Sequence, residues 1–154
     1  MEAEILGNER SKPLFPAFIE NERPFFNSRY YDHSDVPVSI PFGRRDFYKI
    51  WLLNSESNLH YANRSIHITQ PALVFSNPLI PYAYEGLSAN RSGYWCIFKE
   101  EFLKTNDRVK TLQESPLFKI GSDNVFLLNP EQETAVKGLF DKIISEMATS
   151  YIHK

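Results

Sequence analysis

Between residues 24 and 98, apolar and polar side chains alternate in short runs, and proline, asparagine or serine interrupts them at intervals of roughly 8–12 residues. Alternation with a period of two is typical of strands that bury one face. The pattern predicts strands at residues 25–31, 36–41, 47–53, 58–62, 65–69, 72–76, 82–85 and 93–98. Many short strands with frequent breaks indicate an antiparallel barrel or sandwich, so the predicted fold class is mainly β.

One predicted hairpin can be drawn residue by residue. With Asn63-Arg64 as a two-residue turn, His60 faces His67 across the strand pair. Asparagine tolerates the positive φ that such turns require, whereas arginine is a poorer choice than glycine. The pairing puts both histidines on one face and the apolar side chains on the core face: Leu59, Tyr61, Ile66 and Ile68.

After Phe98 the apolar period becomes helical. Short helices are predicted at residues 99–103 and 107–114, followed by one more strand at 125–128. The clearest element comes last, with Asn129 as N-cap, Pro130 at the first helical position and Gln132 completing a capping box. No glycine or proline stops this helix before the end of the chain, so we expect it to continue into a longer parent protein.

The last helix carries one continuous apolar stripe. Its members recur at helical spacing: Val136, Leu139, Phe140, Ile143, Ile144, Met147 and Tyr151. Part of such a stripe must cover the strands, and part is free to pair with a second copy of the helix across a two-fold axis. The stripe therefore predicts a homodimer interface.

Composition narrows the class of protein. A chain of 154 residues suits one domain, and its apolar runs are far shorter than the ~18–20 residues of a membrane span, so no membrane partner is expected. The N-terminus lacks the features of a signal peptide, and a single cysteine excludes a disulfide framework; both favour a reducing, cytoplasmic location. A net charge of −2 argues against direct binding of a nucleic-acid backbone.

Motifs for common enzyme chemistry are missing from the sequence: no phosphate-binding glycine loop, nucleophile elbow or zinc-protease helix occurs. His60 and His67 could meet across the hairpin and join a third metal ligand, or they could form a polar pair facing solvent. Cys96 lies in an apolar strand without a neighbouring histidine, which favours a buried, inert thiol over a reactive one.

Two cations share one side of the segment at residues 42–53. Strand parity puts Arg45, Phe47, Lys49 and Trp51 on one side. If that side faces the barrel interior, the cations line a cavity suited to an anionic or polyhydroxylated ligand, because unpaired buried cations are costly. Otherwise both cations lie at the rim and bury only their stems.

Three segments resemble those of a known protein family: RDFYKI at 45–50, PALVFSNP at 71–78 and GYWCIFKEEFL at 93–103. In order and spacing they resemble the N-terminal cupin domain of AraC-type transcription regulators, over residues 24–154. The resemblance implies a cupin jelly-roll barrel at 24–98 and a helical dimerisation region at 99–154, and the polar, irregular residues before them predict an N-terminal arm at 1–23. It also implies that DNA is read only by a C-terminal domain with two helix-turn-helix motifs, which this chain does not contain.

The resemblance also identifies the positions that bind metal in metal-dependent cupins. Aligned on Asp46-Phe47-Tyr48, the family's two histidines, its glutamate and its last histidine correspond here to Gly43, Arg45, Lys49 and Tyr82. None of these residues binds divalent ions well, so we expect no metal, no other cofactor and no metal-dependent catalysis.

The expected function is that of a ligand-sensing and dimerisation domain rather than an enzyme. The effector is an unidentified small molecule, anionic or sugar-like, and the residues expected to bind it are Arg45, Lys49, Trp51, Tyr82 and Tyr84, with Tyr61 and Tyr94 as second choices. The residues expected to form the dimer are Val136, Leu139, Phe140, Ile143, Ile144 and Met147.

Two alternatives remain open. The barrel could be filled by its own aromatic side chains and bind nothing, which would leave the chain as an oligomerisation platform. The chain could also be a small stand-alone cupin enzyme that works without metal, such as a sugar epimerase or isomerase, with Tyr82, Lys49 or His60 as acid and base.

Overall fold

The computed structural model describes residues 17–19, 24–32, 39–43, 45–61, 63–103, 106–119 and 123–152. The strands are β1 (Phe26–Tyr31), β2 (Ser39–Gly43), β3 (Tyr48–Leu53), β4 (Ser57–Tyr61), β5 (Arg64–Ile68), β6 (Ala72–Ser76), β7 (Tyr82–Gly86), β8 (Gly93–Phe98) and β9 (Val125–Leu127). The helices are the short 3₁₀ helix η1 (Glu100–Leu103) and the α-helices α2 (Asn106–Glu114) and α3 (Pro130–Ile152).

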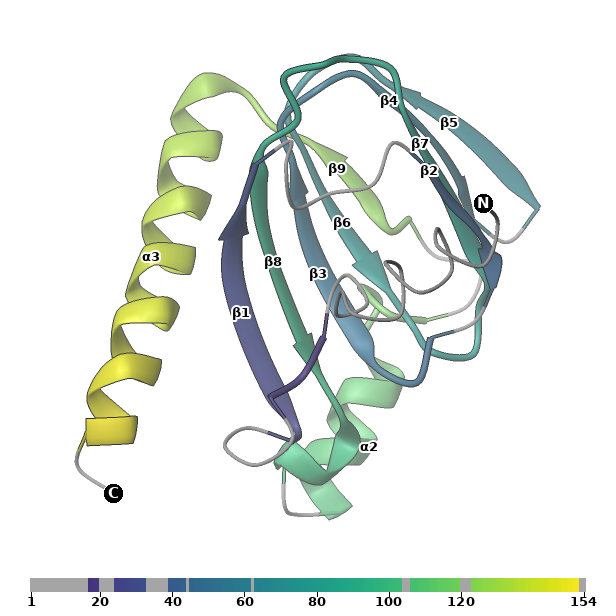
Figure 1. Cartoon of the computed structure of the whole chain (residues 1–154). Coiled ribbons are helices and arrows are strands. Elements are labelled where there is room, and N and C mark those ends of the chain that lie inside the picture. The colour runs from purple at the N-terminus through teal and green to yellow at the C-terminus, as the bar shows by residue number, and fades with distance from the viewer. Residues whose placement is uncertain are drawn as a thin grey trace, which may run out of the picture.

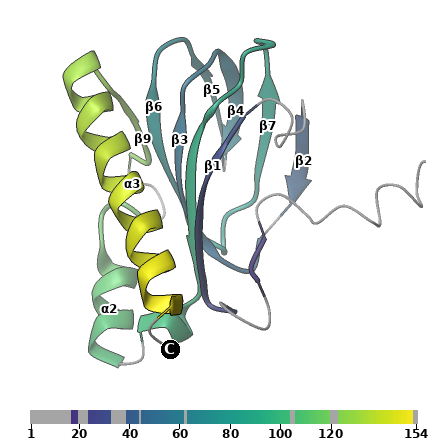
Figure 2. The same ribbon diagram turned by 60° about the vertical axis from the view of Figure 1, so that its left-hand side comes forward.

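The strands form two antiparallel sheets that face each other (Figure 1). One sheet has five strands in the order β1-β8-β3-β6-β9, and the other has four in the order β2-β7-β4-β5. The view in Figure 2 shows α2 and α3 on the outer side of the five-stranded sheet. The mainly β class expected from the sequence is therefore confirmed, with two antiparallel sheets and a C-terminal helix.

Most of the predicted strands match the observed ones closely. The predictions at 72–76 and 93–98 coincide with β6 and β8, and other strand ends move by one to three residues. Residues 36–38 of one predicted strand, and most of the predicted arm at 1–23, lie outside the described residues. Within the arm, Phe18 packs edge-on against Phe47, with 5.8 Å between ring centroids.

Alternating side chains along the strands build two separate apolar layers. The layer between the sheets draws Trp51 and Leu53 from β3, together with aromatic side chains of β4 and β7. The layer on the outer side of the five-stranded sheet draws Tyr48 and Leu52 from the same strand. The predicted parity of this strand is thus confirmed, since neighbouring residues of β3 enter different layers.

The predicted register of the hairpin is wrong by two residues. His60 pairs with Ser65 rather than His67, and Asn58 is the residue opposite His67. The tight turn lies one residue earlier than predicted, because Tyr61 pairs with Arg64. Since a shift of two preserves the parity of a strand, Leu59 and Ile68 still face the layer between the sheets.

The start of α3 is as the sequence predicts. Asn129 Oδ1 accepts a 2.8 Å hydrogen bond from the backbone nitrogen of Gln132, and Gln132 Oε1 accepts one of 2.9 Å from the backbone nitrogen of Asn129. This reciprocal pair is the predicted capping box. No helix in the described part of the chain is long and apolar enough to cross a membrane.

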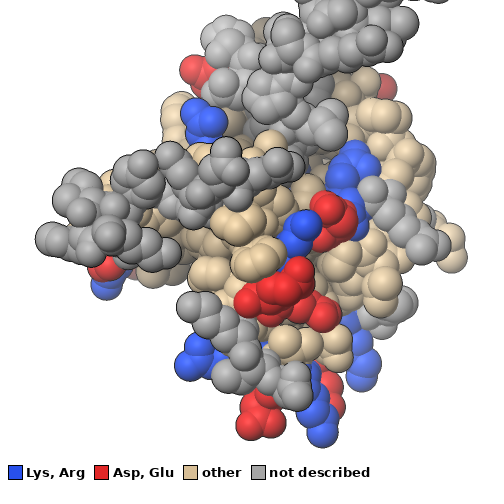
Figure 3. All heavy atoms as spheres, turned by 60° about the horizontal axis from the view of Figure 1, so that its bottom comes forward, with Lys and Arg blue, Asp and Glu red and all other residues tan. Residues whose placement is uncertain are grey.

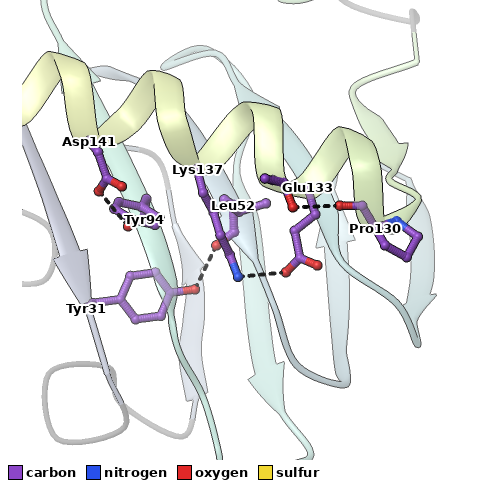
Figure 4. A network of polar contacts seen from close by, with 8 residues as sticks. Tyr31, Leu52, Tyr94, Pro130, Glu133, Lys137 and Asp141 are labelled. Atoms are coloured by element: carbon purple, nitrogen blue, oxygen red, sulfur yellow. Dashed lines mark hydrogen bonds and ion pairs between the residues drawn. The ribbon is translucent and has the colours of Figure 1, made fainter.

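The helix α3 lies against the outer face of β1 and β8 (Figure 4). The ring of Phe140 stacks on that of Tyr94 at 5.2 Å, and the Tyr94 hydroxyl donates a 2.7 Å hydrogen bond to Asp141. The neighbouring Leu139 side chain is 62% exposed, whereas Phe140 is only 4% exposed. The predicted apolar stripe is therefore divided between the sheet and the surface.

The strand β9 belongs to the five-stranded sheet although it follows α2 in the chain. It pairs antiparallel with β6, with Val125 opposite Val74. The buried Asn124 fixes its start: the Asn124 side-chain nitrogen donates to the Phe75 carbonyl, and the Asn124 carbonyl accepts from the Phe75 nitrogen. The strand β9, which lies within the predicted helical region at 99–154, thus forms one edge of the five-stranded sheet.

Candidate functional site

The candidate site lies between the sheets, around the side chain of Lys49. Lys49 is on β3, and its side chain is 0% exposed. Its amino group donates a 3.3 Å hydrogen bond to the hydroxyl of Tyr82, on β7 of the opposite sheet. The same nitrogen lies 3.3 Å from the centroid of the Trp51 ring. The sequence left open whether Lys49 lies in the interior or at the rim, and the structure places it in the interior.

Arg45 lies beside this buried group, just before β3. Its guanidinium carbon is 5.0 Å from the centroid of the Tyr82 ring, and the residue is partly exposed. Gly43 is the residue opposite Tyr82 in the register of β2 and β7. A Cβ added at Gly43 would lie 2.9 Å from Arg45 Nη1, so the glycine leaves room for the guanidinium.

Four positions that are distant in the sequence therefore meet at one place. Gly43 ends β2, Arg45 follows it, Lys49 lies on β3 and Tyr82 begins β7. These are the positions that the resemblance equates with the metal ligands of metal-binding cupins. Their side chains supply a guanidinium, an amine and a phenol, all of which can donate hydrogen bonds to an anion or a hydroxyl.

The electrostatics of the site are set by burial. Burial, with a further contribution from the charge of Arg45, lowers the pKa of Lys49 well below its ordinary value. Burial also raises the pKa of Tyr82 to about 12, although Arg45 acts in the opposite direction. Contact with the Trp51 ring acts in the opposite direction, since it favours the ammonium form. The site thus disfavours the ammonium form of Lys49 relative to water and keeps the phenol of Tyr82 protonated at neutral pH.

Trp51 and Tyr84 continue the site along the interior. The Trp51 ring lies 4.9 Å from that of Tyr84 and 6.5 Å from that of Tyr82. The indole nitrogen donates a 2.9 Å hydrogen bond to the hydroxyl of Tyr31, which donates to the carbonyl of Leu52. The predicted binding residues Arg45, Lys49, Trp51, Tyr82 and Tyr84 are thus brought together between the sheets.

Sequence reasoning missed Tyr31, which lies in the same interior. Alternation places Tyr31 on one face of the first strand but does not say which face is inside. Of the second choices, Tyr61 is interior, and its hydroxyl accepts a 3.4 Å hydrogen bond from the backbone nitrogen of Asn77. Tyr94 faces α3 instead, in the outer apolar layer.

The two hairpin histidines do not face each other. His60 Nδ1 is 2.8 Å from the hydroxyl of Ser65, and His67 Nε2 is 2.7 Å from the carboxylate of Glu56. In the described residues, no group of three or more histidine, cysteine, aspartate or glutamate side chains is placed to hold a metal ion. The interpretation of a polar pair at the surface fits these contacts better than that of a metal pair.

Cys96 is buried in the outer apolar layer between the five-stranded sheet and the helices. Burial raises the pKa of its thiol to about 12. Because the thiolate is the reactive form, this position makes the thiol inert at neutral pH.

Charges of both signs lie side by side at the end of the molecule where η1 and α2 are found (Figure 3). Lys99 and Asp46 form a 3.4 Å ion pair there, and Glu100 accepts hydrogen bonds from Tyr48 and Gln113. This mixture on the face shown differs from the one-signed surface that binds nucleic acids.

Comparison with known proteins gives little further information. No family model matches the sequence, and no curated protein matches it. Among solved structures, the chain is similar to ToxT from Vibrio cholerae, an AraC-family regulator, with a TM-score of 0.43 and 10% sequence identity. The match covers 82% of this chain and 54% of that one, so the chain spans about half the length of ToxT.

Proposed function

We propose that the chain is the effector-binding and dimerisation domain of a cytoplasmic, one-component regulator of the AraC type, with a cupin barrel between residues 24 and 98. In this proposal, a helix-turn-helix domain outside the chain reads DNA. The proposal draws on the three sequence segments that resemble that family and on the geometry of the interior.

One observation carries the proposal. Gly43, Lys49 and Tyr82 come from three different strands and Arg45 from the segment before β3, yet backbone pairing and side-chain contacts bring the four residues together. If the alignment to the cupin family is correct, residues at its metal-ligand positions must lie close together in space. Because these residues are not metal ligands, we propose that the site binds a negatively charged or hydroxyl-rich molecule instead of a metal ion.

The effector that fits is acidic or sugar-like. Arg45 and Lys49 repel each other when both are charged, and an anionic group beside them would lower that repulsion. Tyr82 can hydrogen-bond a carboxylate or hydroxyl, and Trp51 and Tyr84 offer apolar surface next to it. Binding in the interior would favour one arrangement of the arm or helices over another, which is the population shift that a sensor requires.

Thermal unfolding with a panel of carboxylates, sugar phosphates and neutral sugars tests this function. At about 100 times its dissociation constant, an effector adds about 2.7 kcal/mol of stability, which corresponds to roughly 5–10 °C in Tm for a chain of this size. Arg45→Ala should abolish the shift, whereas Arg29→Ala, an exposed arginine on β1, should preserve it.

Two outcomes would contradict the proposed site. A shift that survives Arg45→Ala would place the ligand elsewhere in the molecule. A panel that produces no shift would favour the alternative in which the aromatic interior is filled by the chain itself and the domain only oligomerises.

A second candidate function is a metal-independent cupin enzyme. The observation in its favour is the 3.3 Å contact between the Lys49 amine and the Tyr82 hydroxyl, a base and an acid in one buried place. His60 takes no part, since it contacts Ser65 on the other face of the sheet. Repeated turnover of a sugar that is lost in both Lys49→Ala and Tyr82→Phe, with the fold intact, would establish this function over a sensor.

A further inference from the structure

We propose that Lys49 captures a small carbonyl compound bearing a carboxylate, such as an α-keto acid, by forming a Schiff base. The inference rests on the proposed binding site between the sheets and extends it by naming the ligand class and a covalent bond. It concerns a stoichiometric adduct with the protein rather than turnover.

The surroundings of Lys49 are those of a nucleophilic amine. Its nitrogen lies between the ring of Trp51 and the hydroxyl of Tyr82, and its side chain is fully removed from solvent. A lysine becomes nucleophilic when an apolar site or a neighbouring cation disfavours its ammonium form. Both conditions hold here, because burial and Arg45 act together to lower the pKa of Lys49.

Other described lysines lie in surroundings that differ sharply. Lys99 forms an ion pair with Asp46, and Lys137 forms one with Glu133, and both side chains are partly exposed. A carboxylate partner stabilises the ammonium form, which does not attack a carbonyl. Lys49 should therefore react in preference to these two residues.

Arg45 and Tyr82 supply the other groups that the reaction needs. The guanidinium of Arg45 packs over the Tyr82 ring and is partly exposed, so it can pair with the carboxylate of an entering ligand. Tyr82 remains protonated at neutral pH and is within hydrogen-bond distance of the amine. A carbonyl that carries a carboxylate on the adjacent carbon thus meets a cation, an amine and an acid together.

The covalent step is a condensation that needs no oxidant or reductant. The Lys49 nitrogen adds to the carbonyl carbon, and one of its protons passes to the carbonyl oxygen to give a carbinolamine. The carbon–oxygen bond then breaks, and the hydroxyl leaves as water with the proton of Tyr82. The second proton of the nitrogen returns to the tyrosinate, and a carbon–nitrogen double bond remains. The products are one imine and one water.

Reductive trapping tests the proposal on the full chain. The protein is incubated with glyoxylate or pyruvate and sodium cyanoborohydride, and the adducts are located by intact mass and peptide mapping. We expect one adduct per chain, on Lys49, formed about ten times faster than on any other lysine. Modification spread over the surface lysines, or no adduct on Lys49, would overturn the proposal even without a variant.

Variants separate the roles of the three residues. Lys49→Arg should remove the fast adduct, whereas Lys99→Arg and Lys137→Arg should keep it. Arg45→Ala should slow trapping of glyoxylate about tenfold more than trapping of acetaldehyde, because acetaldehyde has no carboxylate and loses only the effect of the Arg45 charge on the pKa of Lys49. Equal slowing of both carbonyl compounds would contradict the role given to Arg45.

The same protein samples distinguish this inference from the proposed function. If glyoxylate or pyruvate raises Tm but no adduct forms on Lys49, the site binds the acid without a covalent bond and only the Schiff base is disproved. If neither probe is trapped and other anions still raise Tm in an Arg45-dependent way, the sensor function stands and the carbonyl proposal fails.

Discussion

The buried position of Lys49 makes the free energy of unfolding depend on pH. Its pKa in the folded chain lies well below the value of about 10.4 expected in the unfolded chain. Between those two values the unfolded chain binds more protons, so the stability contributed by this residue rises as pH rises. Burying the lysine costs most at pH values below its pKa in the folded chain and costs little above its pKa in the unfolded chain.

Lys49→Met should remove this pH dependence. From pH 7 to pH 9.5, the free energy of unfolding of the unmodified chain should rise relative to that of the variant, by up to about 1.4 kcal/mol per pH unit. The raised pKa values of Cys96 and Tyr82 make the free energy of unfolding fall as pH rises, but the unmodified chain and Lys49→Met share these two residues, so their effect cancels in the comparison. Urea unfolding at several pH values measures the difference, and Lys110→Met on the exposed face of α2 is the control.

Parallel pH profiles for Lys49→Met and the unmodified chain would contradict the buried, uncharged amine. A slope of the predicted sign in the Lys110→Met control would show that the effect is not specific to the interior.

The sequence predicts which residues of β3 share a side but not which side is inside. Arg45, Lys49 and Trp51 follow from a period of two, and the strand alone is equally consistent with cations at the rim. The choice depends on Tyr82 and Tyr84, which reach Lys49 and Trp51 only when the second sheet is folded over the first. The local pattern therefore identified the candidates, and tertiary contacts determined that their side of the strand faces the interior.

Elements differ in how much of their structure is local. The capping box at Asn129 and Gln132 is set by neighbouring residues, and its prediction is confirmed atom for atom. The hairpin between β4 and β5 depends on where the turn lies, and without a glycine to mark the turn the predicted register was two residues out. The prediction of which side chains share a face remained correct, because a shift of two residues keeps each side chain on the same side of the strand.

The attachment of α3 to the sheet should depend on Phe140. This ring is almost fully buried and stacks on Tyr94, so Phe140→Ala should lower the free energy of unfolding by about 3 kcal/mol through lost burial and a residual cavity. The adjacent Leu139→Ala removes an exposed side chain and should cost less than about 0.5 kcal/mol in dilute solution. Denaturant unfolding of the pair measures the contrast, and equal losses would contradict the observed orientation of α3.

For the molecule as a whole, the exposed part of α3 is the proposed dimer surface. Leu139 is exposed, and the other proposed residues range from partly exposed to the nearly buried Phe140. Phe140 already packs on the sheet, so among the proposed dimer residues Leu139 is the one most available to a second copy. The division of the stripe thus centres the proposed interface on Leu139.

Leu139→Asp should weaken self-association at least tenfold, because it places a charge in the centre of the proposed apolar contact. Sedimentation at high micromolar concentration measures the change. Ser145→Asp is the matched control, since it adds the same charge at an exposed position further along α3 that points about 120° away from Leu139 around the helix axis. A strict monomer before substitution, or an equal effect of both variants, would rule out dimerisation through this face.

The five-stranded sheet is packed on both sides, and this has a mechanical consequence. Trp51 touches the interior aromatic rings while the next residue, Leu52, lies under the helices, and the hydroxyl of Tyr31 bonds the Leu52 carbonyl from the interior side. A ligand that displaced the Trp51 indole would therefore also shift the backbone of Leu52. Leu52 shares the outer apolar layer with Phe140 of α3, so a shift of this backbone would change the packing beneath the helix.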